Sequence, residues 1–287
     1  MSLSMLLKTA GFVFVAMTLI VFGDTAGKLL MSGGVNPIFV AWSRFAIGAL
    51  ILLPLSGLKW AELRHFADWR IILRALFIVG GICCILTALR TEPIANVFGA
   101  FFIGPVVSYV LAVIFLDEKI TGLRTGLLLM GFAGVMLVVK PGFGATQGIL
   151  YALLAGCSYG AYLAITRATA GQYRPRLLLV SQLMIGAAVL TPVGFAVEWP
   201  DFAMPTVLLL VISAVASAGG NFILVLTNRI ASATLIAPLI YTQLISATVV
   251  GVVVFGDWPD TLALLGLVVI ALSGFGSLLA IRMGPKA

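Results

Sequence analysis

Runs of about twenty predominantly apolar residues recur along the whole chain, and they leave room for few kinds of fold. With 62% hydrophobic and 9% charged residues, the chain lacks the polar surface that a soluble domain of this length needs. An apolar run in lipid must satisfy its backbone hydrogen bonds internally, as a helix does. We predict an all-α, polytopic membrane protein with ten transmembrane helices, at roughly 8–30, 37–57, 69–89, 93–115, 122–140, 146–168, 176–197, 206–227, 233–256 and 261–282.

The few basic residues predict how the chain is oriented. If the N-terminus is inside, thirteen of the 17 Lys and Arg residues, Arg74 among them, fall on the inner side, and only Lys28, Arg90 and Lys140 fall outside. Arg44 falls within a span. Because cytoplasmic loops carry an excess of Lys and Arg, both termini are predicted to be cytoplasmic, in a bacterial-type inner membrane. The net charge of +7 therefore reflects topology, and the expected partner is the lipid bilayer, with no role for nucleic acid.

The two halves of the chain resemble each other at a shift of 137 to 140 residues. The segment "SRFAIGALILLP" at 43–54 aligns with "SQLMIGAAVLTP" at 181–192, and glycine pairs before and after it follow at nearly the same shift. Each half, 1–142 and 143–287, contains five predicted spans, so the second half enters the membrane from the opposite side. Inverted repeats are typical of secondary transporters that work by alternating access; the alternative is a duplication kept for packing symmetry alone.

Three segments also resemble a known family. "LDEKITGLRTGLLLMGFAGVMLV" (116–138) and "FGDWPDTLALLGLVVIALSGFGSLL" (255–279) are similar to the ends of the two EamA-type repeats of the drug/metabolite transporter superfamily, and "APLIYTQLISATVVGVVVFGD" (237–257) resembles its ninth helix. The family's usual Gly-Glu turn is replaced by Asp117-Glu118 and Gly256-Asp257. The resemblance implies two five-helix repeats and a transporter of amino acids, other metabolites, drugs, nucleotides or vitamins.

Asp24 is the acid that lies deepest within a predicted span. It is about 10 Å below the outer end of its helix at 1.5 Å per residue, and Arg44 reaches a similar depth in the next span. Lys28 follows Asp24 at i+4, so two cations are available to hold its carboxylate in the charged form. We predict a structural or gating ion pair in preference to a proton relay. The equivalent positions of the second half are Ala161 and Gln182, so the charged group is expected to be one-sided.

Neutral polar and aromatic residues in the middle of the spans are the candidates for binding a solute. Taken singly, each could equally be a packing residue or an interhelical hydrogen-bond donor. As a set they predict a cavity for a small amphipathic solute: Tyr159, Tyr162, Asn221, Tyr241, Gln243, Asn96 and Phe101. Gly104, Pro105 and Pro238 are predicted helix hinges, because glycine and proline weaken the helical hydrogen-bond ladder.

The function expected from these features is secondary transport, namely export of amino acids with a hydrophobic or aromatic bias and of related metabolites. The alternative is a multidrug, vitamin or nucleotide transporter on the same fold; coupling to protons stays open, and a monomer is sufficient. An intramembrane enzyme would need a paired catalytic set at depth, and the single histidine, His65, lies in a connector. We expect no catalytic residues, no metal and no cofactor. A non-transporting scaffold would have no solute cavity.

Overall fold

The computed structural model describes residues 3–92, 94–139, 146–256 and 258–283, and every regular element in these ranges is helical. A short 3-10 helix, η1 (Trp60–Ala67), and a π-helical turn, η2 (Gly251–Phe255), accompany the α-helices. The α-helices are α1 (Leu3–Ser32), α2 (Pro37–Leu55), α3 (Trp69–Thr91), α4 (Ile94–Phe101), α5 (Gly104–Leu116), α6 (Gly122–Val139), α7 (Gln147–Thr169), α8 (Pro175–Ala196), α9 (Met204–Ile230), α10 (Ala233–Ile240), α11 (Gln243–Val250) and α12 (Thr261–Met283).

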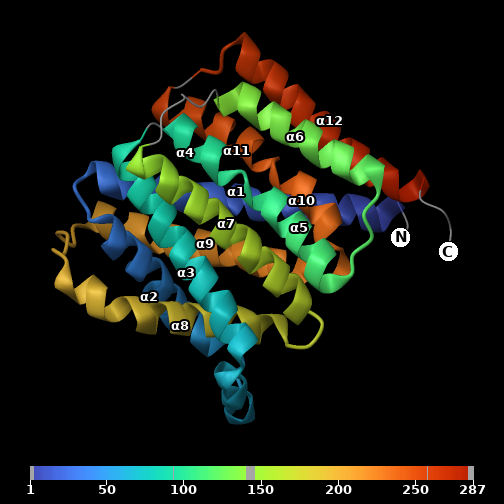
Figure 1. The fold of residues 1–287 in the computed structure, drawn as a ribbon. Helices are drawn as coiled ribbons and strands as arrows, with labels where there is room; N and C mark the ends of the chain where they lie inside the picture. Colours follow the sequence, from blue (N-terminus) through green and yellow to red (C-terminus); the bar gives the residue numbers. More distant parts are fainter. Residues whose placement is uncertain (1–2, 93, 140–145, 257, 284–287) are drawn as a thin grey trace.

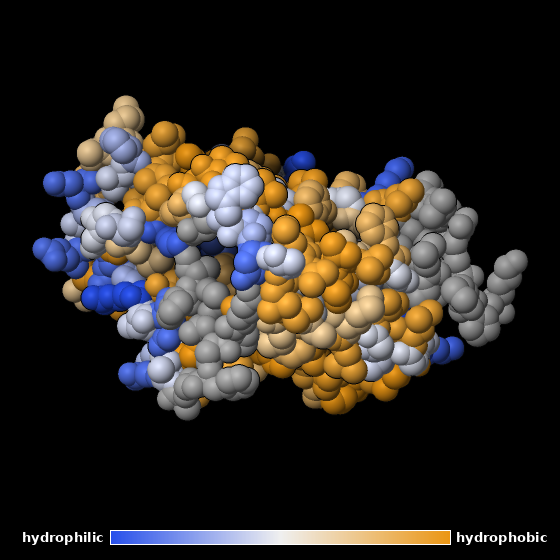
Figure 2. All heavy atoms as spheres, turned by 90° about the horizontal axis from the view of Figure 1, so that it is seen from above, coloured by the Kyte–Doolittle hydropathy of each residue, from blue (hydrophilic) through white to orange (hydrophobic). Residues whose placement is uncertain are grey.

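The prediction of an all-helical, polytopic membrane protein is confirmed for the described residues. Nine segments of the described residues are long and apolar enough to cross a membrane, and the Thr261–Gly276 part of α12 is a shorter apolar helix. Large apolar side chains remain exposed on the outside of the bundle, for example Leu50, Phe115 and Val253. Figure 2 shows the resulting broad hydrophobic surface, with hydrophilic residues gathered at one end. Such a surface is stable in lipid and would aggregate in water.

Several helices begin where the sequence supplies a cap. The Asn36 side chain accepts a hydrogen bond from the Ile38 amide and Pro37 follows it, so α2 starts at a residue whose missing N–H costs nothing. Asp68 caps α3 through the Arg70 amide at 2.9 Å, and Thr146 caps α7 through the Ile149 amide at 3.2 Å. These side chains satisfy amide groups that the first helical turn leaves unpaired.

Two of the spans are interrupted rather than continuous. The first break separates α4 from α5 and lies beside Gly104 and Pro105; the second separates α10 from α11 at Tyr241 and Thr242, just after Pro238. Proline cannot donate to the carbonyl one turn earlier, so these are places where a helix is expected to break. Both predicted hinge positions therefore adjoin a break, and their motion remains a prediction.

The helices pack as long pairs (Figure 1). α1 lies along α9, and α3 lies along α7. The pair α6 and α12 forms one edge of the bundle, and the pair α2 and α8 forms the opposite edge. We call the end of the bundle where α1 and α3 begin the inner end and the opposite end the outer end, following the orientation predicted from the charges.

The inner connectors bind to one another. Arg174 donates to Glu62 of η1 at 3.0 Å, and the Tyr173 hydroxyl donates to Asp68. The bond from Tyr173, together with the amide of Arg70, lowers the pKa of the Asp68 carboxyl below its ordinary value. The connector between α2 and α3 is thereby fastened to the connector between α7 and α8.

Candidate functional site

A small cavity lies at the centre of the bundle, between α1, α2, α3, α4, α7, α9 and α11. Its volume is about 40 Å³, close to the space that one water molecule occupies in the liquid. Six of the residues predicted to bind or gate a solute line it: Asp24, Arg44, Phe101, Tyr159, Asn221 and Gln243. The structure thus brings together side chains from both halves of the sequence around one central space.

A larger hollow opens above the cavity, toward the outer end. This vestibule has a volume of about 430 Å³, within the range of pockets that hold small organic ligands. Its walls are mostly apolar, and they also include the charged side chains of Lys28 and Asp260, the rings of Phe98, Phe255 and Trp258, and the hydroxyl-bearing Thr248. Asp24 and Phe98 line both spaces. These two residues therefore stand at the boundary between the vestibule and the cavity.

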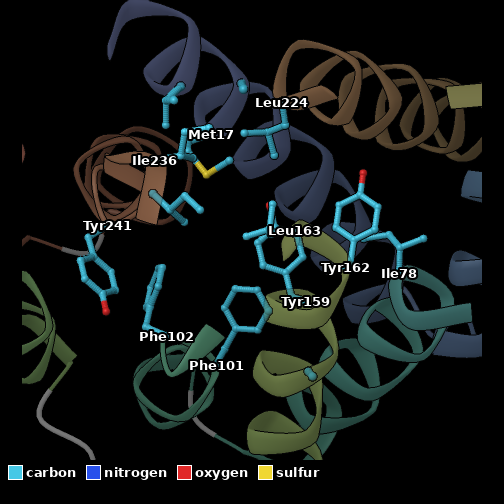
Figure 3. Close-up of a cluster of buried hydrophobic side chains, with 14 of the residues drawn as sticks. Met17, Ile78, Phe101, Phe102, Tyr159, Tyr162, Leu163, Leu224, Ile236 and Tyr241 are labelled. Atoms are coloured by element: carbon cyan, nitrogen blue, oxygen red, sulfur yellow. The ribbon is translucent and has the colours of Figure 1, made fainter. Parts of the chain in front are cut away.

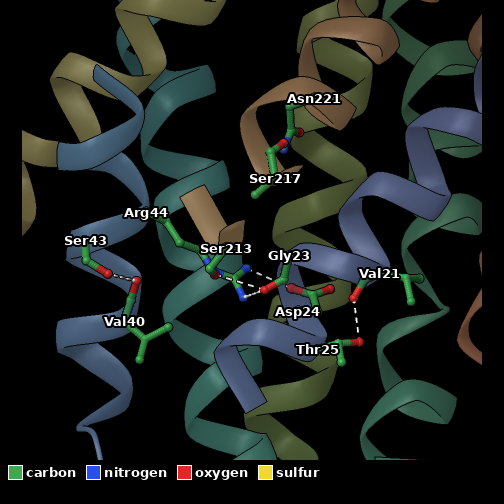
Figure 4. A network of polar contacts seen from close by, with 10 residues as sticks. All are labelled: Val21, Gly23, Asp24, Thr25, Val40, Ser43, Arg44, Ser213, Ser217 and Asn221. Carbon is green, nitrogen blue, oxygen red and sulfur yellow. Dashed lines mark hydrogen bonds and ion pairs between the residues drawn. The ribbon is translucent and has the colours of Figure 1, made fainter. Parts of the chain in front are cut away.

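Asp24 forms an ion pair with Arg44 at this boundary (Figure 4). Arg44 Nη1 donates to Asp24 Oδ1 at 2.8 Å, Nη2 donates to the Gly23 carbonyl at 2.8 Å, and Nε donates to Ser213 Oγ at 2.8 Å. The arginine side chain is 4% exposed and the aspartate side chain 23% exposed. One partner is therefore locked among α1, α2 and α9, while the carboxylate still faces the vestibule.

Lys28, the other predicted partner of Asp24, lies one helical turn nearer the outer end. Its ammonium group lies 4.2 Å from the centre of the Phe255 ring, in a cation–π geometry. It lines the vestibule with Asp24. The vestibule thus contains the side chains of Lys28 and Asp260, which differ in sign, and the Asp24–Arg44 pair lies at its inner boundary.

Tyr159 is the aromatic residue of the cavity wall. Its ring lies 5.4 Å from that of Phe101 and 5.9 Å from that of Tyr162, centre to centre, and Figure 3 shows the three rings side by side. The Tyr159 hydroxyl is buried without a hydrogen-bond partner among the described residues. Buried polar groups in proteins are nearly always satisfied. The orphan hydroxyl is therefore a group that a solute or a water molecule can satisfy.

Tyr162 is fully buried behind the cavity wall rather than in it. Its hydroxyl lies 3.1 Å from both Gln182 Oε1 and Asn221 Oδ1, and it accepts a hydrogen bond from Arg74 Nη2 at 3.0 Å. Asn221 lines the cavity, so it is linked through this hydroxyl to Arg74. Tyr162 connects the cavity to a buried cation.

The placement of Arg74 corrects the sequence interpretation. Arg74 was assigned to the inner polar side, but its side chain is fully buried between α3, α7 and α8. The charged group around Asp24 is consequently not the only one: a second buried arginine lies in the inner half. A weak sequence signal for it exists, because Gly80-Gly81 and Gly219-Gly220 align at a shift of 139, which pairs Arg74 with Ser213.

The remaining predicted residues lie elsewhere. Tyr241 is fully buried against Phe102 and Phe132, on the far side of the aromatic cluster from Tyr159 (Figure 3), and its hydroxyl also has no partner among the described residues. It does not line the central cavity. The Asn96 side chain lies outside the described residues. Of the predicted set, Tyr162 and Tyr241 thus stand behind the cavity.

The inner end is closed by polar contacts between the two halves. Glu118, at the end of α5, accepts hydrogen bonds from the amides of Ala233 and Thr234 at 3.0 and 2.9 Å, where α10 begins. Arg167 of α7 forms an ion pair with the same carboxylate at 3.3 Å. Sequence reasoning placed Glu118 only in a turn motif. Its carboxylate caps a helix of the other half, where the helix dipole favours negative charge.

Comparisons with known proteins agree with a membrane transporter. The sequence profile described as the EamA-like transporter family matches the chain twice, over residues 7–140 and 146–279. A crystal structure with 18% sequence identity superposes with a TM-score of 0.80 over 97% of this chain and 99% of its own, which establishes the shared fold alone.

Relatives that are named for a solute cover most of the chain. The S-adenosylmethionine uptake transporter of Rickettsia bellii is 27% identical over 80% of both chains. The riboflavin transporter of Vibrio cholerae is 27% identical over 82% of this chain and 80% of its own. The pseudopaline exporter of Pseudomonas aeruginosa is 25% identical over 82% and 83%, respectively. These relatives share a class of function while their solutes differ.

Proposed function

Because the chain belongs to the EamA-like transporter family, we propose that it is a secondary transporter of small metabolites that combine an amino-acid head group with an apolar or aromatic body. The observation that carries this proposal is the Asp24–Arg44 pair at the boundary between vestibule and cavity. A solute that moves inward must pass this pair. The proposal thus specifies that the solute carries both an ammonium group and a carboxylate, as amino acids do.

A zwitterionic head group is the electrostatic complement of this pair. Its carboxylate can replace Asp24 on the Arg44 guanidinium, and its ammonium group can replace Arg44 on the Asp24 carboxylate. Both protein charges then stay compensated while the pair opens, which avoids the cost of leaving a buried charge unpaired. A solute with one charge compensates only one partner.

The walls around the pair favour an apolar or aromatic body. Phe98, Phe255 and Trp258 line the vestibule, and Phe101 and Tyr159 line the cavity. Aromatic walls with a few placed polar groups are typical of sites for small organic ligands. The Tyr159 hydroxyl has no hydrogen-bond partner among the described residues, so it can form a hydrogen bond with a polar atom of the solute.

The difference in size between the two spaces supports a mechanism of alternating access. At about 40 Å³ the cavity is too small for a metabolite, while the vestibule at about 430 Å³ is large enough. A solute must therefore enlarge the cavity and open the inner end, where Glu118 and Arg167 now join the halves. In this proposal the structure is a state open toward the outside and closed toward the cytoplasm of a bacterial inner membrane.

Ten crossings in two inverted repeats, residues 1–142 and 143–287, complete the proposal. Two features support them: the EamA-like profile matches once in each half, and each half contains one interrupted helix at an equivalent place. The pairing of α1 with α9 is mirrored by that of α3 with α7, as a two-fold relation between the halves requires. Inverted repeats that share a central site are typical of secondary transporters.

Cysteine labelling tests the inverted arrangement. In a protein whose Cys83, Cys84 and Cys157 are replaced by alanine, a membrane-impermeant maleimide added to intact cells is expected to label Ser32→Cys but not Gly171→Cys. After permeabilisation both should be labelled. Both positions are exposed, so accessibility to the reagent depends on the side of the membrane. Labelling of both variants in intact cells would contradict the inverted repeat.

A vitamin-type solute is the second candidate. Relatives described as riboflavin transporters favour it, as do the uncharged hydrogen-bonding groups of Asn221 and Gln243 in the cavity. A neutral solute of this kind would not use the charges of Asp24 and Arg44. The role of that pair therefore discriminates between the two candidates.

The direct test is exchange of labelled solute in proteoliposomes that contain the purified protein. Vesicles preloaded with unlabelled L-phenylalanine, S-adenosylmethionine or riboflavin are supplied with the labelled compound outside, with and without a pH gradient. We expect exchange of L-phenylalanine and S-adenosylmethionine, which both carry a zwitterionic head group, and little exchange of riboflavin. Riboflavin exchange alone would favour the vitamin-type candidate. Since related proteins are named for uptake and for export, net efflux from loaded vesicles tests the predicted direction, export.

A further inference from the structure

Arg74 is a buried cation that has no carboxylate partner among the residues that the structure describes. Its guanidinium donates to Thr166 Oγ1 at 2.8 Å, to the Leu178 carbonyl at 2.8 Å and to the Tyr162 hydroxyl at 3.0 Å. It also lies 4.7 Å from the centre of the Tyr162 ring. None of the ion pairs among the described residues involves Arg74. All of its protein partners are neutral.

Burying a cation among neutral partners costs free energy, which the three hydrogen bonds offset only in part. Arg74 is the sixth residue of α3, about 8 Å from the start of the helix at 1.5 Å per residue. A long basic side chain so close to a helix end normally extends to the water interface. Arg74 instead points into the bundle and is 0% exposed. An ionisable residue that faces the interior of a membrane protein is by default a candidate functional residue.

Arg74 occupies the counterpart of the Arg44 site. Arg44 bridges α2 to α1 and α9, and the repeat relates these three helices to α8, α7 and α3, which Arg74 bridges. At the shift of 139, Arg74 corresponds to Ser213, the residue that accepts from Arg44 Nε. The two junctions differ in one respect: the outer arginine is paired with the carboxylate of Asp24, whereas no carboxylate of the described ranges pairs with the inner one.

Arg74 is also connected to the solute cavity. Its Nη2 group bonds the Tyr162 hydroxyl, which in turn lies 3.1 Å from Asn221 Oδ1, and Asn221 lines the cavity. Tyr162 belongs to α7 and Leu178 to α8, whereas Arg74 belongs to α3. Opening the inner end between the halves would therefore separate the guanidinium from these neutral acceptors. A carboxylate would bind it more strongly than they do, because it adds the attraction of the opposite charge and can accept two parallel hydrogen bonds from a guanidinium.

We infer that Arg74 binds the carboxylate of the transported solute in the inward-open state, as the inner counterpart of Arg44. The missing anion of the inner junction is thus supplied by the solute. This inference rests on the proposed function, because it requires a solute that carries a carboxylate. It adds that the two faces of the transporter recognise the carboxylate with different arginines.

The test compares L-phenylalanine with L-phenylalaninamide, which lacks only the carboxylate. Each compound competes with labelled L-phenylalanine in right-side-out and in inside-out membrane vesicles, and vesicles without the protein provide the background. We expect the wild type to prefer the acid over the amide at least tenfold on both faces. Arg74→Gln should reduce the ratio of acid to amide binding to about one on the inner face and leave it unchanged on the outer face. Arg44→Gln should reduce this ratio to about one on the outer face and leave it unchanged on the inner face.

Two further variants separate recognition from folding. Arg74→Met replaces the cation with an apolar side chain of similar length, a change that buried ionic sites often tolerate, so it reports the preference if Arg74→Gln is poorly inserted. Arg70→Gln is the matched control, since Arg70 lies one turn earlier on α3 and bonds Gln172. We expect this control to keep the preference for the acid on both faces.

The possible results are distinct. If Arg74→Gln or Arg74→Met weakens binding of acid and amide equally, or leaves the inner preference intact, Arg74 only fastens α3 to α7 and α8, and the inference is wrong. If the wild type prefers the acid on neither face, the proposed function itself fails. Loss of the preference confined to the inner face supports the inference.

Discussion

Replacing Arg44 with glutamine is expected to reduce transport of a zwitterionic solute at least thirtyfold. The buried Arg44 guanidinium makes three hydrogen bonds, and one of them is the 2.8 Å ion pair to Asp24. Truncating one partner of a buried charged pair costs about 2–5 kcal/mol, and 2 kcal/mol corresponds to about thirtyfold. The measurement is the initial rate of labelled L-phenylalanine exchange in proteoliposomes.

The double variant Asp24→Asn/Arg44→Gln separates gating from folding. Either single change leaves one charge uncompensated, whereas the double change removes both, and an amide pair can still form a hydrogen bond. We expect the double variant to recover thermal stability but not transport of the zwitterion. Transport that recovers together with stability would mean that the pair only braces the outer half of the bundle.

Replacing Gly160 with alanine is expected to destabilise the protein by about 1–3 kcal/mol, the usual cost of overpacking a core. At Gly160 an added Cβ would lie 2.5 Å from the Gly104 carbonyl oxygen and 2.8 Å from Val107 Cβ. A backbone oxygen cannot swing aside as a flexible side chain can, so α7 must move away from the break between α4 and α5. Since that break holds Phe101 against Tyr159, transport should fall as well.

Gly126→Ala is the matched control for this change. It adds the same carbon to the interior of α6, where nothing lies within 4 Å of it. Alanine is favoured over glycine in a helix by about 0.5–1 kcal/mol, so the control should be as stable as the wild type or slightly more so. Equal melting temperatures for the two variants would show that the crossing at Gly160 is looser than described.

The membrane fold and the outer ion pair were predictable because lipid restricts both strongly. An apolar run must be helical in a bilayer, and a charge at depth requires a partner at the same depth. Counting residues from the helix ends therefore predicted Arg44 as one of two partners of Asp24, Lys28 being the other, and the structure shows the pair with Arg44. The broken helices likewise adjoin Gly104, Pro105 and Pro238, whose effects on a helix are local.

Other features depend on how helices rotate and pack, which one sequence does not specify. Tyr159 and Tyr241 look alike in the sequence, yet one lines the cavity and the other faces Phe102 and Phe132. Arg74 was placed at the inner surface because basic residues near a helix end usually reach water. The vestibule could not be inferred either, since it forms where α1, α3, α4, α6, α11 and η2 meet the start of α12.

The most direct test of head-group recognition by Asp24 and Arg44 measures which parts of a solute the protein binds. L-phenylalanine, phenethylamine and 3-phenylpropionate share the aromatic body; the second lacks the carboxylate and the third lacks the ammonium group. Each is used as a competitor of labelled L-phenylalanine exchange in proteoliposomes. We predict that the zwitterion competes at least tenfold better than either single-charge compound. Equal competition by all three would contradict recognition of the head group by Asp24 and Arg44.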